Sequence, residues 1–239
     1  TFNNNLATSI GGGAICALGG ASCAEQPCEF SIDSSVFKDN RSPFGSGGSL
    51  LLDKSDASVT KSSFVGTATT DEKGKDCTNA RRNFEFGTLD NDETPDVKCD
   101  KRLKNAMQGG AIAVNTMQSI LKLDTVLIKG LLASFGGGLY TSKASTCKMN
   151  NVTFDSNEAK FGGAFQGVQG SVLELVKGSV VYNYASVDGG GVHMEKSNLV
   201  MNTTTLYENV AATNGGGIYV DKRSKLHGAY NTITSNRAL

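Results

Sequence analysis

An apolar residue followed three places later by Asn recurs along this chain at a nearly constant interval. The strong copies are Phe2/Asn5, Phe37/Asn40, Phe154/Asn157, Val180/Asn183, Leu206/Asn209 and Ile233/Asn236, and the weaker copies are Phe64/Thr67 and Leu127/Gly130. Where the period is uninterrupted, successive copies lie 26 or 27 residues apart. A fixed period of this length is typical of a solenoid, in which each repeat buries its apolar face against its neighbours.

Each repeat contains short runs of period-two alternation. Segments 191–195 and 217–221 place apolar side chains at every second position after a glycine cluster, which indicates a strand. A second run, such as 173–175, and a third, such as 152–154, belong to the same repeat. Three short strands and three turns per coil of about 26–27 residues predict an all-β fold, a parallel β-helix.

The Asn of each motif copy is expected to lie at an equivalent turn. Asn suits such a turn because it tolerates a left-handed conformation and bonds nearby backbone with its own amide. We expect these residues to stack as a ladder along the rod: Asn5, Asn40, Asn157, Asn183, Asn209 and Asn236. Internal hydrogen bonding is the favoured interpretation of this row, and a polar ligand site is the alternative.

The chain fits one elongated β-helix domain, residues 1–239, with surface loops inserted at about 17–28 and 69–104. Its 23 Lys+Arg balance 23 Asp+Glu, which argues against a nucleic-acid partner or an anionic membrane. No apolar run is long enough to cross a membrane as a helix. Because Thr1 begins inside a repeat, a mature or excised fragment is expected.

The insertions hold two cysteine pairs, Cys23 with Cys28 and Cys77 with Cys99. A loop without its own core gains from a covalent restraint, so we expect a disulfide within each pair, with unpaired thiols as the alternative. Cys16 and Cys147 are placed at inward strand positions, Cys16 level with Leu51, Met194 and Val220, and Cys147 level with Leu173 and Leu199. They would lie too far apart to bond and should be free. No cofactor or metal is expected, since the chain has 2 His and no Cys-x-x-Cys.

Asn151 and Asn202 stand in Asn-x-Thr sequons and are predicted to occupy the same turn in two different coils. In a eukaryotic source they would be glycosylation candidates, and chance occurrence is the alternative.

The strand after each glycine cluster suggests an outward stripe. If its flanking columns face the core, the column between them faces water. That column is predicted to contain Ile15, Leu50, Ile112, Tyr140, Phe165, His193 and Tyr219. An exposed apolar stripe of this length would mark a contact surface, whereas reversed parity or covering by ladder neighbours would remove it.

The pairing of the Phe-x-x-Asn motif with Gly-Gly-Ala-Ile resembles the repeat of chlamydial polymorphic outer-membrane proteins. Here the motifs are residues 2–5 with 12–15, and 109–112. Similar repeats occur in right-handed β-helix proteins on the surfaces of bacteria, algae and protists. The resemblance implies a right-handed coil and an extracellular or cell-surface structural or adhesive role. The chain departs from that family's pattern in that most of its glycine sites read Gly-Gly-Gly rather than Gly-Gly-Ala.

The leading functional interpretation is therefore a non-catalytic surface rod, with partners among its own copies or cell-surface glycans and proteins. A polysaccharide lyase or hydrolase is the rival, but such sites need clustered carboxylates. The carboxylates of the regular coils are scattered: Asp53, Asp155, Glu174, Asp188 and Glu208. A carbohydrate-binding module that stacks sugars on Tyr140, Phe165 and Tyr219 is a third possibility.

The ends of the chain lack a charged, helical or Pro-rich cap. Open ladder edges template further strands. The sequence is therefore expected either to be cut from a longer β-helix or to stack head to tail into a surface filament.

Overall fold

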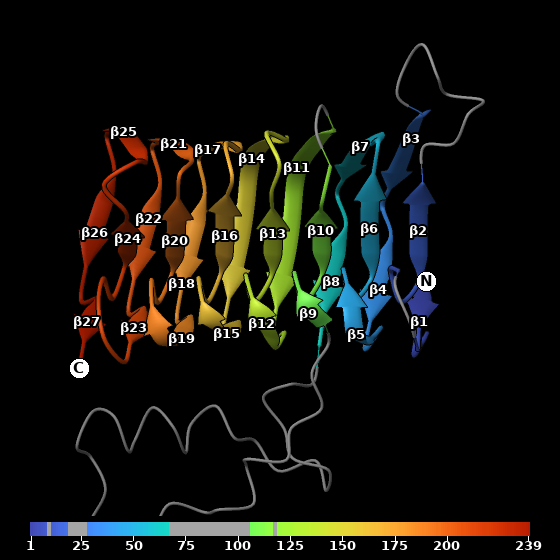
Figure 1. Cartoon of the computed structure of the whole chain (residues 1–239), viewed down its shortest axis with the longest axis horizontal. Coiled ribbons are helices and arrows are strands. Elements are labelled where there is room, and N and C mark those ends of the chain that lie inside the picture. The colour runs from blue at the N-terminus through green and yellow to red at the C-terminus, as the bar shows by residue number, and fades with distance from the viewer. Residues whose placement is uncertain (9–10, 19–27, 67–105, 117–118) are drawn as a thin grey trace, which may run out of the picture.

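The computed structural model describes residues 1–8, 11–18, 28–66, 106–116 and 119–239. They form the predicted right-handed parallel β-helix, whose coils stack side by side along a rod with the described ends at opposite extremes (Figure 1). The insertion predicted at 69–104, and most of that at 17–28, lies outside these residues. Within them, no helix is long and apolar enough to cross a membrane.

Three sheets run along the rod. The sheet that follows the glycine clusters, here the glycine sheet, contains β2 (Ile15–Leu18), β6 (Leu50–Asp53), β10 (Ile112–Val114), β13 (Leu139–Thr141), β16 (Phe165–Val168), β20 (Val192–Glu195) and β24 (Ile218–Val220). The sheet after the Asn turn, here the short sheet, contains β5 (Ser42–Ser46), β9 (Ala106–Gln108), β12 (Ala133–Phe135), β15 (Glu158–Phe161), β19 (Tyr184–Asp188), β23 (Val210–Ala211) and β27 (Arg237–Ala238).

The remaining sheet, here the long sheet, is bent at a corner in each coil and has 13 strands. They are β1 (Phe2–Asn3), β3 (Cys28–Asp33), β4 (Val36–Lys38), β7 (Ser55–Thr60), β8 (Ser63–Val65), β11 (Ile120–Lys129), β14 (Thr146–Asp155), β17 (Val172–Val176), β18 (Ser179–Val181), β21 (Asn198–Asn202), β22 (Thr205–Tyr207), β25 (Lys225–Ala229) and β26 (Thr232–Thr234).

The strand registers confirm the repeat and correct one weak copy. Phe37 pairs with Phe64, but Phe64 and Phe154 both pair with Ile128, not with Leu127. Ile128 is fully buried and Leu127 is half-buried, so the prediction was one residue off. The error arose because Leu127 and Ile128 are both apolar, so the pattern alone could not choose between them.

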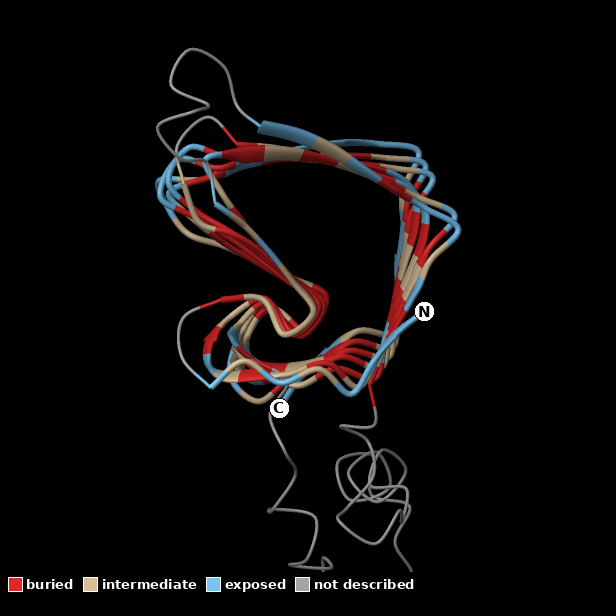
Figure 2. Cartoon of the chain, turned by 90° about the vertical axis from the view of Figure 1, so that its right-hand side faces the viewer, coloured by how far each residue is buried: buried red, intermediate tan, exposed pale blue. Residues whose placement is uncertain are grey.

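A single core runs the length of the rod. Phe2 stacks on Phe37 and Phe37 on Phe64, both with ring centroids 4.6 Å apart. The short sheet contributes small buried side chains, among them Ala159 and Ala185. In cross-section the buried segments line the interior of the coil and the exposed ones lie at its corners (Figure 2).

Candidate functional site

The Asn residues of the motif form the ladder. The backbone N–H of Asn157 donates to Oδ1 of Asn183 (2.9 Å), whose own N–H donates to Oδ1 of Asn209 (3.0 Å). The Asn183 Nδ2 group also donates to the Phe154 carbonyl of the preceding coil (3.1 Å). Asn157, Asn183 and Asn209 are at most 1% exposed. Their polar atoms are engaged inside the protein and are not offered to a ligand.

The left-handed residue at this turn is the one before each Asn. Ser156, Tyr182 and Glu208 have φ of 55°, 61° and 49°. In the weak copy the corresponding position is Gly130 (φ 66°), and Leu131 takes the place of Asn, its N–H donating to Asn157 Oδ1 (3.2 Å). Gly130 was therefore wrongly paired with the Asn column.

A second internal row lies where the glycine sheet turns into the long sheet, and sequence reasoning missed it. Ser171 Oγ donates to Ser197 Oγ (3.2 Å), and the Ser197 N–H donates to Ser224 Oγ (3.0 Å). The spacing of these serines follows the 26- to 27-residue period, which is the signal that could have found them.

The predicted exposed stripe is wrong. Leu50, Ile112 and Phe165 are fully buried and belong to the core. Ile15 pairs with Leu50 in that same inward column and packs against the core. Tyr140, His193 and Tyr219 belong to the neighbouring column, because Tyr140 pairs with Ala113 and Gln166, and His193 pairs with Gln166 and Tyr219.

The mistake came from aligning coils on the last glycine of each cluster. The first glycine sets the register, since Gly136 and Gly162 share a positive φ of 59° and 64°. A third glycine such as Gly138 occupies the slot that Ala111 or Ala164 fills in other coils, as their matching carbonyl acceptors show. Aligned in this way, the column with Tyr140 and His193 points away from the core.

That outward column is covered along what we call the lateral seam, where the glycine sheet meets the strand ends of the short sheet. Figure 2 shows the chain doubling back between these two sheets. The His193 ring lies 5.2 Å from the Phe161 ring of β15 and stacks on Tyr219 at 5.0 Å. Further along the seam, Asn115 Nδ2 donates to Ser46 Oγ (2.9 Å). The column that was predicted to face water is therefore covered by contacts between the glycine sheet and the short sheet.

His193 is 5% exposed in this seam. Its Nδ1 lies 3.1 Å from Gln166 Nε2, which suits a neutral imidazole that accepts there and carries its proton on Nε2. Burial lowers the pKa of His193, and the carboxylates of Asp188, Glu195 and Asp221 oppose that shift by a smaller amount. Burial therefore favours the neutral form of the ring.

The aromatic platforms proposed for sugar stacking are not available together. Phe165 is fully buried in the core. In the column that points away from the core, Tyr140 is 8% exposed and Tyr219 is half-buried. Burial raises the pKa of Tyr140, and a hydrogen bond with Ser142 acts against that shift. A flat aromatic surface for sugar binding is thus absent at these three positions.

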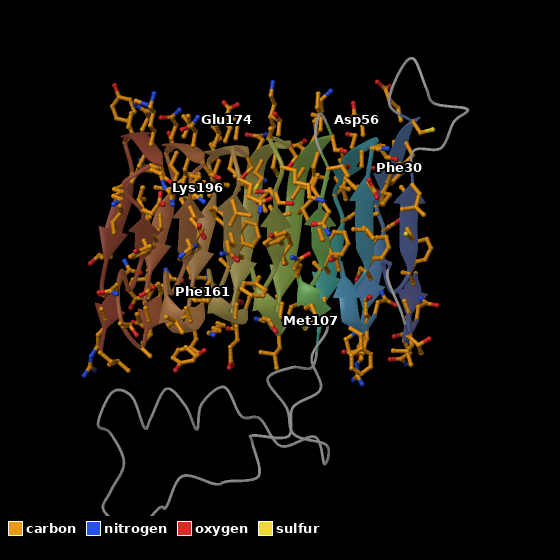
Figure 3. The ribbon with its side chains drawn as sticks, in the orientation of Figure 1. Phe30, Asp56, Met107, Phe161, Glu174 and Lys196 are labelled. Carbon is orange, nitrogen blue, oxygen red and sulfur yellow. The ribbon has the colours of Figure 1, made fainter. Side chains whose placement is uncertain are left out.

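In the described part of the chain, no group of three or more His, Cys, Asp or Glu could hold a metal ion. A cavity of about 80 Å³ lies on the long sheet between Glu29, Phe30, Asp56 and Lys122. Figure 3 labels Phe30 and Asp56 there. One carboxylate oxygen of Asp56 accepts from the Ile120 N–H (2.7 Å), and Glu29 stands opposite Asp56 in register.

Cys16 and Cys147 are free, and Cys147 pairs in register with Leu173 as expected. Cys16 pairs with Leu51 but points outward and is exposed, which corrects its predicted inward position and its alignment with Met194. The pairings Cys23–Cys28 and Cys77–Cys99 stay predictions, because Cys23, Cys77 and Cys99 lie outside the described residues.

The two sequon residues share a corner but not a position. Asn202 is in register with Val176 and Asn150, so Asn151 corresponds to Thr203. Asn151 is exposed with φ 52°, whereas Asn202 is half-buried at the end of β21. Of the two, Asn151 presents its side chain better to a glycosylating enzyme.

Lysines occupy the left-handed position at the corner that leaves the glycine sheet. Lys54, Lys143 and Lys196 have φ of 52°, 54° and 51°, and all three are exposed. A left-handed conformation costs a residue with a Cβ about 1 kcal/mol and favours Gly, Asn or Asp. Local turn chemistry therefore does not explain why lysine recurs at this corner.

These features define a class of protein: a parallel β-helix repeat protein whose repeating polar residues are used internally. A comparison with family models places the Chlamydia polymorphic membrane protein repeat at residues 1–18 and 203–221, in agreement with the resemblance read from the sequence. The second match covers the Leu206/Asn209 motif and the glycine cluster that begins at Gly215. Comparisons with curated proteins and with solved structures found no match.

Proposed function

We propose that this chain is a non-catalytic rod displayed at a cell surface, with a structural or adhesive role. The match to a polymorphic membrane protein repeat is the observation that carries the proposal. The geometry supports it: the repeated Asn and Ser side chains satisfy the turns, and no group of His, Cys, Asp or Glu among the described residues could hold a metal ion. A solenoid of this kind offers long outer faces for contact with partners.

Surface display is tested on intact source cells with an antibody to the chain. Labelling of unpermeabilised cells, and loss of that labelling after mild external proteolysis, is the expected result. Labelling that appears only after permeabilisation would contradict the proposal.

The non-catalytic assignment is tested separately with polygalacturonate and alginate as substrates. Neither new unsaturated ends, detected by ultraviolet absorbance, nor new reducing ends should appear above a heat-denatured control. Turnover of either polymer would favour the lyase or hydrolase alternative.

The finer proposal is association end to end. Leu226 and Ile233 continue the inward columns of Leu199 and Leu206, yet they are 41% and 55% exposed. A further coil would cover them, supplied either by more of the same chain or by another copy. Electron microscopy of the native material separates these cases, because fibres with a regular axial repeat support association and isolated rods contradict it.

A further inference from the structure

We propose that one edge of the rod binds an acidic polysaccharide laid parallel to the rod axis. We call it the basic edge, and it consists of the corner residues Lys143, Lys196, Lys222 and Arg223 with Lys122 and Lys148 beside them on the long sheet. The inference names a partner class for the surface rod proposed above, on which its biological setting rests. It goes further because it assigns the binding to particular side chains.

The corner positions are equivalent in successive coils. The Ala144 N–H donates to the Gln169 carbonyl (3.0 Å), and the Gly170 N–H donates to the Lys196 carbonyl (2.7 Å), so the corner of each coil stacks on the next. Lys143, Gln169, Lys196 and Lys222 thus form one row, and every one of them is exposed. Figure 3 shows Lys196 just beyond the arrowhead of β20.

A second line of charge runs beside this row. Lys122 and Lys148 are directly opposite each other in the pairing of β11 with β14, and both are exposed. Like charges at directly opposed positions repel. Among the described residues, no ion pair holds Lys122, Lys143 or Lys148, whereas Lys129 pairs with Asp155 at 2.6 Å elsewhere on the rod.

The carboxylates near this edge neutralise it only in part. Glu174 stands opposite Lys148 in register, and Glu29 and Asp56 line the same cavity as Lys122. Glu195 lies 3.8 Å from Lys196, with both side chains about half exposed. Asp221 Oδ1 accepts from the Lys196 N–H and from Ser224 Oγ, and its Oδ2 lies 3.8 Å from Arg223 Nε, so this carboxylate pairs with one cation of the edge. The edge therefore keeps an excess of cations, although the whole chain has a formal net charge of zero.

The form of this array selects the partner. Cations repeat along the rod at multiples of the strand spacing of about 4.8 Å, which suits a linear polymer with regularly spaced charges. Lysine ammonium groups act as point charges for sulfate or carboxylate groups. Binding of single-stranded nucleic acid typically adds aromatic side chains on which bases stack. The nearby Tyr140 is only 8% exposed, so an acidic polysaccharide is the better match.

The test compares two matched double variants of the full chain, Lys143→Glu/Lys196→Glu and Lys61→Glu/Lys177→Glu. All four lysines are exposed and have a positive φ, but Lys61 and Lys177 lie at the other corner of the coil. Equal far-ultraviolet circular dichroism spectra and melting temperatures verify that each variant is folded. Binding of the purified chains is measured on immobilised heparin, polygalacturonate and dextran, and on a single-stranded DNA oligonucleotide.

We expect native chain to bind heparin or polygalacturonate but not dextran, with affinity that falls as salt rises. The Lys143/Lys196 variant should lose at least about tenfold in affinity, and the Lys61/Lys177 variant less than about twofold. Preference between heparin and polygalacturonate distinguishes sulfate from carboxylate recognition. Equal losses in both variants, tighter binding to DNA, or no binding to either acidic polymer would overturn the proposal. These outcomes do not depend on where the chain resides, so they leave surface display to its own test.

Discussion

At the scale of single residues, the Asn ladder stabilises turns whose backbone N–H and C=O groups have no hydrogen-bond partner within the turn. Each turn residue of one coil needs a donor or acceptor that the next coil supplies. Asn183 supplies both: its Oδ1 accepts from the Asn157 backbone, and its Nδ2 donates to the Phe154 carbonyl. Removal of the side chain would leave these two buried groups without partners.

We therefore expect Asn183→Ala to lower the free energy of unfolding by about 2–4 kcal/mol, because each unpaired buried polar group costs about 1–3 kcal/mol. Urea denaturation measures the change. The control is Asn150→Ala, whose exposed side chain bonds only Asp124 (2.6 Å) and should change stability by less than about 0.5 kcal/mol. Equal effects at the two positions would show that the ladder bonds contribute nothing beyond an exposed hydrogen bond.

His193 makes the stability of the seam depend on pH. Because burial lowers its pKa in the folded state below the ordinary 6.5, the unfolded chain binds the proton more readily. Stability is then full above that ordinary pKa and declines as pH falls from it towards the folded-state value. The decline should begin near the ordinary pKa of about 6.5 and continue at lower pH.

The measurement is the unfolding free energy of native chain and of His193→Gln at pH values above and below that pKa. Native chain should lose more stability towards acid than the variant, since the variant cannot take up a proton in the seam. His227→Gln, at an exposed position of β25, should follow the native profile. Superimposable profiles for native chain and His193→Gln would refute the assignment.

At the scale of strands and turns, the glycine pair sets the register of each coil. A Cβ on Gly163 would lie 2.2 Å from the carbonyl oxygen of Gly190 in the next coil. Such a contact forces the backbones apart. The third glycine slot is less restricted, since Ala164 fills it in one coil.

Gly163→Ala should consequently lower the melting temperature by several degrees more than Gly191→Ala, which places its new methyl group in the third slot. For Gly191, the nearest carbonyl oxygen lies 2.7 Å from the added Cβ, so a smaller shift accommodates it. Thermal denaturation followed by circular dichroism measures both variants. A reversed order would mean that the second glycine is not the tightest point of the turn.

Phe154 tests the core column of the long sheet. It is fully buried between Ile128 and Val180 in register. Phe154→Ala should lower the free energy of unfolding by about 3–5 kcal/mol, the usual cost of emptying a buried aromatic site. Lys148→Ala, on the outer face of the same strand, is the control. An unchanged unfolding curve for Phe154→Ala would show that this site collapses without cost.

The element scale also shows what the sequence could and could not predict. The coil, its three strands and the Asn column follow from the period, because identical positions recur in identical environments. The side of the glycine sheet that faces water could not be read from period two alone: Leu51, Tyr140 and Gln166 point away from the core and are nevertheless buried. Their burial depends on the lateral seam between the glycine sheet and the short sheet. A local sequence pattern does not predict that these two segments come into contact.

Position within a turn was the other source of error. Asn151 and Asn202 each precede a hydroxyl residue at the right spacing, yet the left-handed residue falls on Asn151 in one coil and on Thr203 in the other. A corner that accepts Lys, Asn, Thr and Ser alike carries little sequence signal. The corner that leaves the glycine sheet is also tolerant, since Gln169 stands there between Lys143 and Lys196, so its lysines were overlooked.

At the scale of the whole molecule, the two free thiols differ in their exposure to solvent. Cys16 is exposed near the N-terminal end, whereas Cys147 is fully buried in the core and burial raises its pKa far above its usual value. A thiolate is the reactive species, so Cys147 is doubly protected. Its reactivity should therefore depend on opening of the rod.

We expect a thiol reagent to modify Cys16 within minutes in native chain and Cys147 only at the rate of unfolding. Peptide mapping under non-reducing conditions identifies the modified residues and also tests the predicted Cys77–Cys99 and Cys23–Cys28 disulfides. Rapid native labelling of Cys147 would indicate local opening of β14. A Cys16–Cys147 bond would contradict the coil alignment.

The pairing of β8 with β11 has a consequence for how such a rod can change. Phe64 and Ile128 stand side by side as neighbouring rungs, although 63 residues separate them in the chain. The pairing of one coil with the next therefore does not depend on the length of the peptide that connects their strands. Gene duplication can therefore add coils, and a foreign peptide can be inserted between β8 and β11, without changing the pairing of the other strands. The register of stacked coils is therefore fixed by the strands themselves, whatever the length of the peptide that connects them.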